Sequence, residues 1–269
     1  MTTGQLRQNG PPAPARHAMA RHTMSKVPEV TVYFWITKVL TTGMGETTSD
    51  FLAHQLNPII AVGLAGIVLA AALVLQFKAR QYVPWIYWTA VVMVSVFGTM
   101  AADILHVGLG VPYFASTTFF VIVLAVIFAV WYASEKTLSI HSIHTRRREL
   151  FYWATVMATF ALGTAAGDLT AVSMHLGYFS SGVMFAVLFA LPALLYRLFG
   201  LNEIFSFWFA YVVTRPFGAS FADWMGVSKA RGGLALGTGS VSLALAVVIA
   251  GFVCYLAVSR KDVAHGATG

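Results

Sequence analysis

Five carboxylates stand in apolar parts of this sequence, where acidic side chains are costly to place. They are Glu46, Asp50, Asp103, Asp168 and Asp223. An ionised Asp at the centre of a membrane-spanning helix costs about 2.5–3.5 kcal/mol, so such acids usually face a cavity and mark ion or proton pathways. The chemistry that these five residues could do is cation binding or proton exchange.

The four aspartates occupy one position of an internal repeat. Each copy has a Trp, a Gly ten residues later and an Asp fifteen residues later. The copies are Trp35, Gly45 and Asp50; Trp88, Gly98 and Asp103; Trp153, Gly163 and Asp168; and Trp208, Gly218 and Asp223. The sequence contains five Asp in all, so coincidence does not explain four matches. The pattern indicates four tandem copies of one unit.

The elements that must position these residues are predicted to be membrane-spanning helices. The sequence is 58% hydrophobic and 10% charged, which is typical of polytopic membrane proteins. Apolar runs of about 20 residues, enough to cross about 30 Å of hydrocarbon, recur eight times. They lie at about 31–54, 58–77, 84–106, 113–134, 149–172, 178–199, 203–226 and 233–257. We therefore predict an all-α fold with eight transmembrane helices.

Each repeat contains two crossings, so the four copies should run parallel around an axis along the membrane normal. We expect an eight-helix membrane domain at 28–258, with repeats at about 28–80, 81–140, 146–200 and 201–258. Residues 1–27 match neither a signal peptide nor a packed domain and are predicted to be a disordered cytoplasmic tail. Residues 259–269 are predicted to be a cytoplasmic tail. Fifteen helical residues rise about 22 Å. With the tryptophans in the cytoplasmic aromatic belt, the aspartates would form a ring in the outer third of the bilayer.

Small residues predict which helices form the inner bundle. The residue before each ring Asp is Ser49, Ala102, Gly167 or Ala222. Together with the repeat Gly, each makes a small-xxx-small stripe, which allows helix backbones to approach closely in lipid. We therefore expect the first helix of every repeat to lie inside, with the glycines and tryptophans in packing roles.

Basic residues predict the orientation. They collect in the N-terminal tail, in connections of one side and in the C-terminal "SRKD", whereas the opposite connections hold only Lys229 and Arg231. The positive-inside rule then places both termini in the cytoplasm. The net charge of +7 reflects this topology, and no nucleic-acid motif accompanies it. The "RRRE" run at 146–149 is expected to anchor at lipid headgroups.

The first repeat carries more polar side chains than its copies. Lys38, Thr42, Glu46 and Asp50 follow at four-residue intervals along one helix face. The supporting residues that we assign to the acids are Lys38, Thr42, Thr47, Thr99, Thr164 and Arg215. Five acids against Lys38 and Arg215 leave −5 + 2 = −3 charges. A bound divalent cation, alone or exchanged against protons, would neutralise this surplus.

Histidines near the predicted outer end could add metal ligands. The candidate ligand set is Asp50, His54, Asp103, His106, Asp168 and Asp223, with His175 further from its Asp. Carboxylate with imidazole suits Mn, Fe, Co, Ni or Zn, an all-oxygen site favours Mg or Ca, and Met44, Met100, Met174 and Met225 would admit copper(I). The alternative is that these histidines are interfacial residues in short connections.

Structural interpretations stay open for the same residues. The tryptophans are expected to be belt anchors, and the aspartates could only hold the bundle together. Arg215 could neutralise a neighbouring Asp in a structural ion pair, and Lys38 could extend to the cytoplasmic interface. Pro216 should break a helical hydrogen bond inside the bundle.

The segments "VPEVTVYFW", "GETTSDFL", "GTAAGDLT" and "TRPFGASFADW" resemble a family of bacterial membrane proteins built from four tandem two-helix repeats, catalogued as domain of unknown function 347. The resemblance covers about residues 27–258 and includes all four copies in order. It implies an inner-membrane protein with eight helices, and it carries no established function.

The sequence holds no enzyme signature such as GxSxG, HExxH or a phosphate-binding loop, so we do not expect an enzyme. We expect a transporter for a cation, foremost a divalent metal ion, with proton coupling. Its expected partners are the lipid bilayer, the cation and a second copy of the chain; no covalent cofactor is expected. The alternatives are a proton-coupled transporter or channel for another small solute, and a non-transporting scaffold or sensor.

Overall fold

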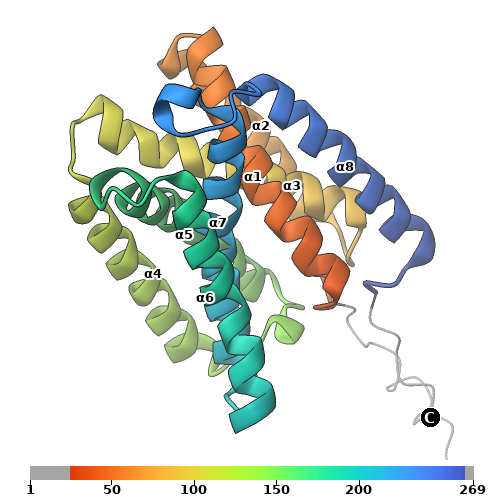
Figure 1. Ribbon diagram of the computed structural model, residues 1–269. Helices are drawn as coiled ribbons and strands as arrows, with labels where there is room; N and C mark the ends of the chain where they lie inside the picture. The colour runs from red at the N-terminus through yellow and green to blue at the C-terminus, as the bar shows by residue number, and fades with distance from the viewer. Residues whose placement is uncertain (1–24, 264–269) are drawn as a thin grey trace, which may run out of the picture.

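The computed structural model describes residues 25–263 as eight long helices joined by short connections (Figure 1). They are α1 (Val32–Gln55), α2 (Pro58–Lys78), α3 (Pro84–Asp103), α4 (Tyr113–Glu135), α5 (Arg146–Asp168), α6 (Tyr178–Phe199), α7 (Glu203–Gly226) and α8 (Thr238–Ser259). Short helical turns lie between them at Ile104–Gly108, Ile140–Ser142, Leu169–Ser173 and Lys229–Arg231. The described residues form no strand, which agrees with the all-α prediction.

Local sequence signals account for where several helices begin. The Thr31 hydroxyl accepts a hydrogen bond from the Phe34 amide at 3.3 Å, and the Asn202 side chain accepts one from the Phe205 amide at 3.0 Å. Both bonds satisfy backbone donors that the first helical turn leaves free. Pro58 and Pro84 stand in the first turns of α2 and α3, where the missing amide proton is not needed.

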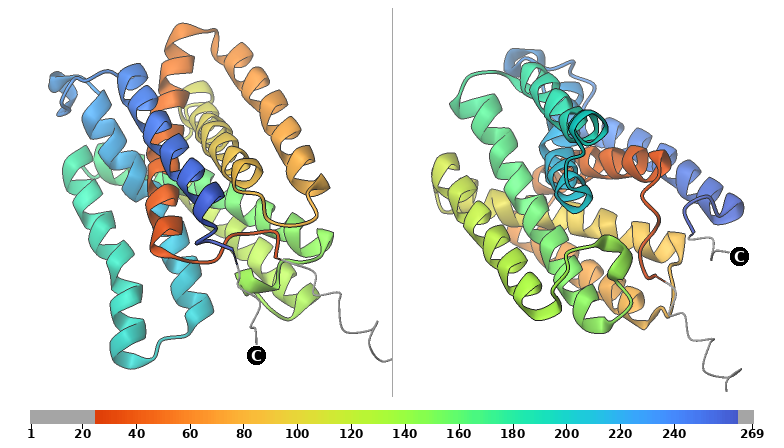
Figure 2. Two further views of the ribbon diagram at one scale, coloured as in Figure 1. Left: turned by 90° about the vertical axis from the view of Figure 1, so that its right-hand side faces the viewer. Right: turned by 90° about the horizontal axis from the view of Figure 1, so that it is seen from below.

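The odd-numbered helices form an inner ring and the even-numbered helices cover it. Each inner helix packs on the next one, in the order α1, α3, α5, α7 and back to α1. The main outer contacts are α2 on α3, α4 on α5, α6 on α7 and α8 on α1. Each outer helix therefore covers the inner helix of the following repeat, and the last repeat covers the first. Figures 1 and 2 show α4 and α8 on opposite flanks of the bundle.

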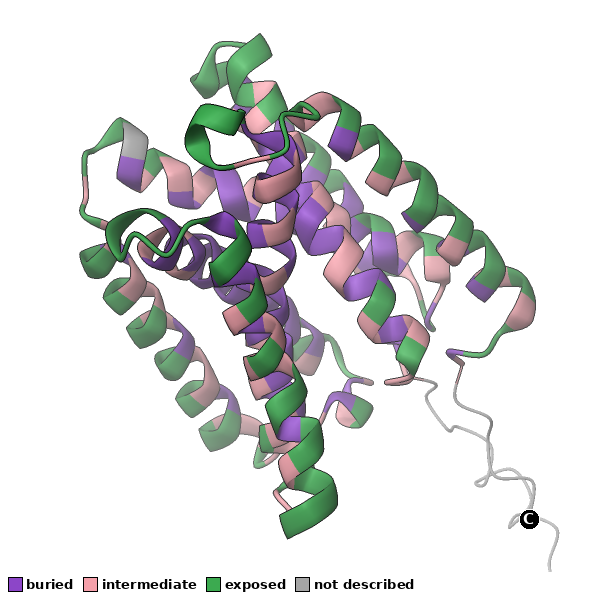
Figure 3. Cartoon of the chain, viewed as in Figure 1, coloured by how far each residue is buried: buried purple, intermediate pink, exposed green. Residues whose placement is uncertain are grey.

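Burial follows the same two layers. In the most apolar stretch of each outer helix only 17–22% of residues are buried, against 56% for α3 and 72% for α5. Figure 3 shows the exposed residues along the outer helices and the buried ones at the centre. The expectation that the first helix of every repeat lies inside agrees with this arrangement.

Six of the eight helices are long and apolar enough to cross a membrane: α2, α3, α4, α5, α6 and α8. The other two, α1 and α7, have 24 residues each but carry buried charged side chains that lower their hydropathy. These include Lys38 and Glu46 on α1 and Arg215 on α7. The two most polar helices are neighbours in the inner ring.

The two described chain ends meet at one end of the bundle. We call this the Trp end, because the four repeat tryptophans lie there, and the opposite one the Asp end. The Glu29 amide donates to the Asp262 carbonyl at 2.9 Å, and the Tyr82 hydroxyl donates to the Asp262 carboxylate. Burial raises the pKa of Asp262, although the bond from Tyr82 opposes this shift. Residues 260–263 thus fold back on the bundle rather than forming a free tail.

The segment before α1 also differs from the predicted disordered tail. Val27 is 4% exposed, and Lys26 forms a buried ion pair with Glu149 at 2.6 Å. The Gln76 side chain donates to the same carboxylate at 3.1 Å. Glu149, the last residue of "RRRE", is therefore a core residue and not part of a lipid anchor. Residues 1–24 and 264–269 of the predicted tails lie outside the described residues.

Candidate functional site

Close contacts between repeat positions join the inner helices in a cycle. Counted from the repeat Trp, the Gly stands at position +10, and a Cβ added there would collide with the residue at position +7 of the following repeat. The pairs are Gly45 with Ser95, Gly98 with Phe160, Gly163 with Arg215, and Gly218 with Thr42. The fourth repeat thus contacts the first as each other repeat contacts its successor. The glycines are packing residues, as predicted, and they close a ring of four.

The ring stacks equivalent residues in layers along its axis. Successive layers lie four residues apart on each inner helix, which is a rise of about 6 Å. From the Trp end, they are position −1 (Phe34, Tyr87, Tyr152, Phe207), +3 (Lys38, Val91, Val156, Tyr211), +7 (Thr42, Ser95, Phe160, Arg215), +11 (Glu46, Thr99, Thr164, Ala219) and +15 (the four Asp). All members of the first four layers are buried. The layers run from aromatic, through cationic, to acidic.

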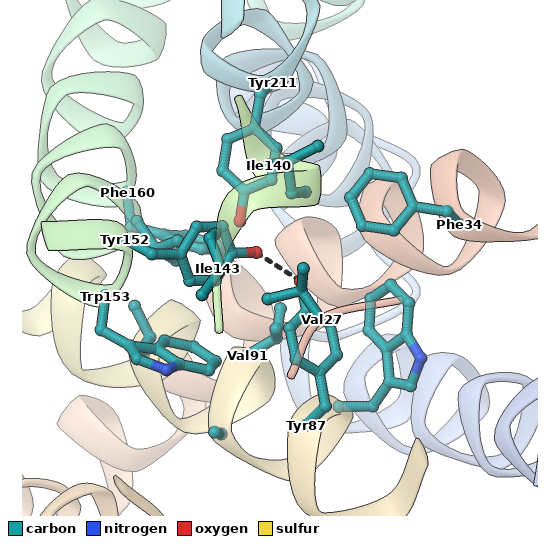
Figure 4. Close-up of a cluster of buried hydrophobic side chains, with 14 of the residues drawn as sticks. Val27, Phe34, Tyr87, Val91, Ile140, Ile143, Tyr152, Trp153, Phe160 and Tyr211 are labelled. Carbon is teal, nitrogen blue, oxygen red and sulfur yellow. Dashed lines mark hydrogen bonds between the residues drawn. The ribbon is translucent and has the colours of Figure 1, made fainter. Parts of the chain in front are cut away.

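An aromatic cluster closes the Trp end of the axis. The Tyr87 and Tyr152 hydroxyls hydrogen-bond each other, and both rings are fully buried (Figure 4). The expectation that the tryptophans anchor in an aromatic belt is wrong for three of them, since Trp88, Trp153 and Trp208 are only 1%, 4% and 5% exposed. They pack between neighbouring helices of the bundle, where they form part of its core.

Arg215 and Glu46 form a buried ion pair at the centre of the bundle. Arg215 is 1% exposed, and one of its terminal nitrogens contacts the Glu46 carboxylate and the Thr99 hydroxyl. The same nitrogen donates to the Thr164 hydroxyl at 2.8 Å, and the other donates to the Thr42 carbonyl at 3.0 Å. One guanidinium therefore binds side chains from the other three repeats. The prediction that Arg215 neutralises an Asp is corrected: its partner is Glu46.

Lys38 lies one layer nearer to the Trp end and has no hydrogen-bond partner among the described residues. It is 1% exposed, so the expectation that it extends to an interface is wrong. Its ammonium nitrogen lies 3.9 Å from the centroid of the Phe160 ring and 4.2 Å from that of Tyr211. These contacts hold Lys38 between two aromatic faces inside the bundle.

The four aspartates lie at the Asp end, one on each inner helix. Asp223 is 7% exposed, and the other three are partly exposed. Asp103 lies within electrostatic range of Glu46, Asp50 and Asp168. Directly after their Asp, helices α3 and α5 each continue as a short π-helix, at Ile104–Gly108 and Leu169–Ser173. Such turns are frequent at functional sites.

Arg231 is the charged group that faces this acidic ring from the connection between α7 and α8. Partial burial disfavours its charge, but Tyr178 and the ring carboxylates outweigh this effect and raise the pKa of Arg231. Its guanidinium donates to the Tyr178 hydroxyl at 2.6 Å. The ring is therefore neighboured by a permanent cation. The sequence prediction had used Arg231 only as a marker of orientation.

The histidines do not join the aspartates in a metal site in this conformation. The His54 ring lies 2.6 Å from the Asp50 backbone carbonyl, and His106 packs on the Tyr113 ring at 4.3 Å. His175 is exposed. Within residues 25–263, no three side chains of His, Cys, Asp or Glu lie together so that they could hold a metal ion.

Of the other supporting residues, Thr42 links α1 to α7 directly, because its hydroxyl donates to the Thr214 carbonyl at 3.1 Å. The Thr47 hydroxyl bonds within its own helix, to the Gly43 carbonyl at 3.2 Å and the Met44 carbonyl at 3.4 Å. Pro216 is buried within α7, which continues through it as one helix. Residues of the axis that the motif search missed are Tyr87, Tyr152, Phe160 and Tyr211; aligning the repeats at −1, +3 and +7 would have shown them.

A separate cavity of about 990 Å³ opens on the side of the bundle near the Trp end. It lies between α1, α6 and α7, and its walls include Trp35, Phe189 and Phe207. Arg197 and Glu203 are its charged residues. This cavity contains none of the five acids that the sequence singles out.

The fold and the site define an all-helical protein made of four two-helix units closed into a ring, with acids at one end of its axis. A family model described as Repeat of Unknown Function (DUF347) matches residues 33–82, 86–137, 151–200 and 206–262, and the chain belongs to this family. No curated protein and no solved structure matches the chain significantly.

Proposed function

We propose that this protein transports a cation across a membrane, with the four aspartates as the entry site and the Glu46–Arg215 pair as the internal gate. The observation that carries the proposal is that the Asp ring leads directly to a buried ion pair on the axis of the bundle. Among the described residues, Arg215 is the hydrogen-bond partner of the buried Glu46 carboxylate, and an incoming cation could take its place. Packing of the inner helices alone would not require a carboxylate at Glu46, one layer below the aspartates.

The proposed setting is a bacterial inner membrane with both termini in the cytoplasm. Six apolar helices and largely exposed outer faces support membrane insertion. Basic residues at the Trp end support a cytoplasmic position for that end. The Asp ring then faces the outside. The aromatic cluster and the ion pair close the axis below it, so transport requires a rearrangement of the inner helices.

A divalent metal ion is the proposed cargo, and it would be bound with part of its water shell. Four carboxylates give a strongly negative entry site, but no three ligands converge among the described residues. Hard cations such as Mg²⁺ or Mn²⁺ commonly keep several waters and use few carboxylates. This chemistry fits the ring better than a closed zinc or copper site. The protein would carry the ion as substrate and not as a resident cofactor.

Uptake of Mn²⁺ into proteoliposomes tests this function. Asp103→Asn and Asp168→Asn should abolish saturable uptake, because each removes one charge of the entry site. Glu203→Gln is the control, since this exposed acid lies at the opposite end. Thermal unfolding in detergent checks that each variant folds. Folded ring variants that transport at the wild-type rate would overturn the proposal.

The lateral cavity favours a second candidate, a proton-coupled transporter for a lipophilic solute. Its apolar walls open toward the side of the bundle, where such a solute would arrive from the bilayer. Ala190→Trp would fill this cavity and leave the axis intact. Under the cation proposal this variant should transport Mn²⁺ normally, whereas a wild type that takes up no Mn²⁺ but moves protons when a lipophilic solute is added, with loss of that movement in Ala190→Trp, would favour the second candidate.

A further inference from the structure

Lys38 is the buried ionisable group that cation binding at the acids does not use. Its ammonium nitrogen has no acceptor among residues 25–263, although an ammonium group offers three donors. The contacts with Phe160 and Tyr211 are cation–π contacts, which are stronger when they are shielded from water. They offset only part of the cost of placing an ammonium away from water.

The groups around Lys38 explain why its protonation depends on the Glu46–Arg215 pair. At its own level, α3 and α5 contribute Val91 and Val156, and α7 contributes Tyr211. The charged group that acts on it is Arg215, which repels its ammonium form. Glu46, the acid that could balance a second positive charge, is bound to Arg215. Lys38 therefore has a cation next to it and no anion of its own.

A cation that binds Glu46 changes this balance further. It would displace Arg215 from the carboxylate and add positive charge to the same buried region. Like charges a few ångströms apart repel strongly where water is scarce. A proton on Lys38 and a metal ion on Glu46 thus exclude each other, which is the condition for coupling two ions in opposite directions.

A chain of hydroxyls leads from Lys38 toward the Trp end. Lys38 contacts the face of the Tyr211 ring, and the Tyr152 and Tyr87 hydroxyls hydrogen-bond each other. The Tyr211 hydroxyl makes no hydrogen bond among the described residues, so joining it to Lys38 and to Tyr152 requires a small movement of these side chains. Figure 4 shows the three hydroxyls pointing toward one another. The Tyr82 ring lies 5.6 Å from that of Tyr87, and its hydroxyl bonds Asp262 at the end of the bundle. The equivalent −1 positions of the first and fourth repeats are Phe34 and Phe207, which have no hydroxyl.

We propose that Lys38 is the proton-exchanging group of this protein and that Tyr211, Tyr152 and Tyr87 connect it to the Trp end. This inference deepens the proposed function, because it makes the cation transporter a cation/proton exchanger. A proton from water at the Trp end passes along the hydroxyls, each Tyr giving one proton and receiving another, and binds the lone pair of the Lys38 nitrogen. When a cation reaches Glu46 from the Asp end, Lys38 releases this proton to water at the Asp end, so that the proton crosses the bundle in the direction opposite to that of the cation.

Proteoliposomes with a pH-sensitive dye inside allow the test, with Mn²⁺ as the probe. In the wild type, Mn²⁺ uptake should move protons in the opposite direction and respond to an imposed pH gradient. In Lys38→Met, the Mn²⁺-driven proton movement and the response to the gradient should be lost. Lys78→Met is the matched control, because Lys78 is exposed at the end of α2. Binding of Mn²⁺ in detergent should persist in Lys38→Met, which separates coupling from cation binding.

Two further measurements keep the inference testable. The double variant Tyr87→Phe with Tyr152→Phe removes two relay hydroxyls with little change in shape, and it should lose proton movement even where Lys38→Met does not fold. Proton flux driven by a potassium diffusion potential is measured without Mn²⁺. If the wild type takes up no Mn²⁺ but shows a proton flux that is lost in Lys38→Met, Lys38 is a proton site and the cation function is rejected. Unchanged gradient dependence in folded Lys38→Met, or in the double Tyr variant, would overturn the inference.

Discussion

At the scale of single residues, Arg215 is the side chain on which the interior depends most. It contacts Thr42 and Glu46 of the first repeat, Thr99 of the second and Thr164 of the third. Its alkyl part also fills the space that the missing side chain of Gly163 leaves. No other residue at position +7 is charged. The four-fold arrangement is thus held by one asymmetric ion pair.

Removing either partner of this pair should destabilise the protein strongly. Arg215→Met leaves Glu46 buried without a partner, and Glu46→Gln leaves Arg215 in the same state, each at a cost of about 3–5 kcal/mol. The double variant should cost clearly less than the sum of the two, because no unpaired charge remains. Thermal or denaturant unfolding in detergent measures the difference. Strictly additive effects would show that the two side chains do not interact.

The sequence predicted the members of this site better than their pairing. Glu46 and Arg215 both stood out as charges in apolar segments, but they are 169 residues apart in the chain. Which acid meets Arg215 depends on the axial register of α1 against α7. That register comes from close backbone contact, in which a Cβ on Gly43 would lie 3.1 Å from the Gly218 carbonyl. Hydrophobic patterns carry no such information, and the same limit explains the wrong expectation for Lys38.

At the scale of the helix, the glycines at position +10 decide how closely the inner helices approach. Gly218→Ala would place a Cβ against the Thr42 hydroxyl and 2.6 Å from the Val39 carbonyl, which is backbone and cannot turn aside. We expect a loss of stability of about 1–3 kcal/mol, as for other overpacked interiors. Thermal unfolding of the purified variant measures this loss.

Gly63→Ala is the matched control for that substitution. Gly63 lies in the outer helix α2, and a Cβ there meets nothing within 4 Å. Alanine is a better helix former than glycine by about 1 kcal/mol, so this variant should be neutral or more stable. If both variants lose stability equally, the close contact between α1 and α7 is not what makes Gly218 necessary.

The sequence predicted the helices and the inner position of the odd ones, because length, hydropathy and small-residue stripes are local properties. The expectation of an aromatic belt was wrong for three of the four tryptophans, because an amphipathic aromatic ring suits both a lipid interface and a packed interior. Only the neighbouring helices decide between these environments. The pairing of each outer helix with the inner helix of the next repeat was also not predictable. Because the repeats are alike, the sequence does not show whether an outer helix packs on the inner helix of its own repeat or on that of the next.

At the scale of the whole molecule, the closed ring has consequences for chain connectivity. The fourth repeat covers the first through α8, and the two described ends meet through the bond between Glu29 and Asp262. In a circular permutant, a short linker would join residues 25 and 263, and the new ends would lie at the exposed α6–α7 connection near Gly200. Such a chain keeps every contact between helices. This circular permutant should fold with nearly the thermal stability of the wild type.

Size-exclusion chromatography and thermal unfolding of the permutant test this expectation. Opening the chain between Leu138 and Ile143 is the contrasting variant, because that connection is part of the core. Ile140 and Ile143 are buried there, and the Leu138 carbonyl accepts a bond from the Trp208 ring nitrogen at 2.8 Å. The contrasting variant should be much less stable. Two permutants of equal stability would show that closure of the ring does not depend on these contacts.

The cyclic contact between position +10 of one repeat and position +7 of the next has a meaning in terms of symmetry. It joins two different surfaces of the same unit, head to tail, and it closes after four steps. In separate chains this is the heterologous interface of a cyclic tetramer. A two-helix ancestor with these two surfaces would have assembled as four identical subunits, and joining them in one chain is what allowed a single Arg and a single Glu to occupy a shared axis. A symmetric tetramer would have placed four of each there, with no room to pair them.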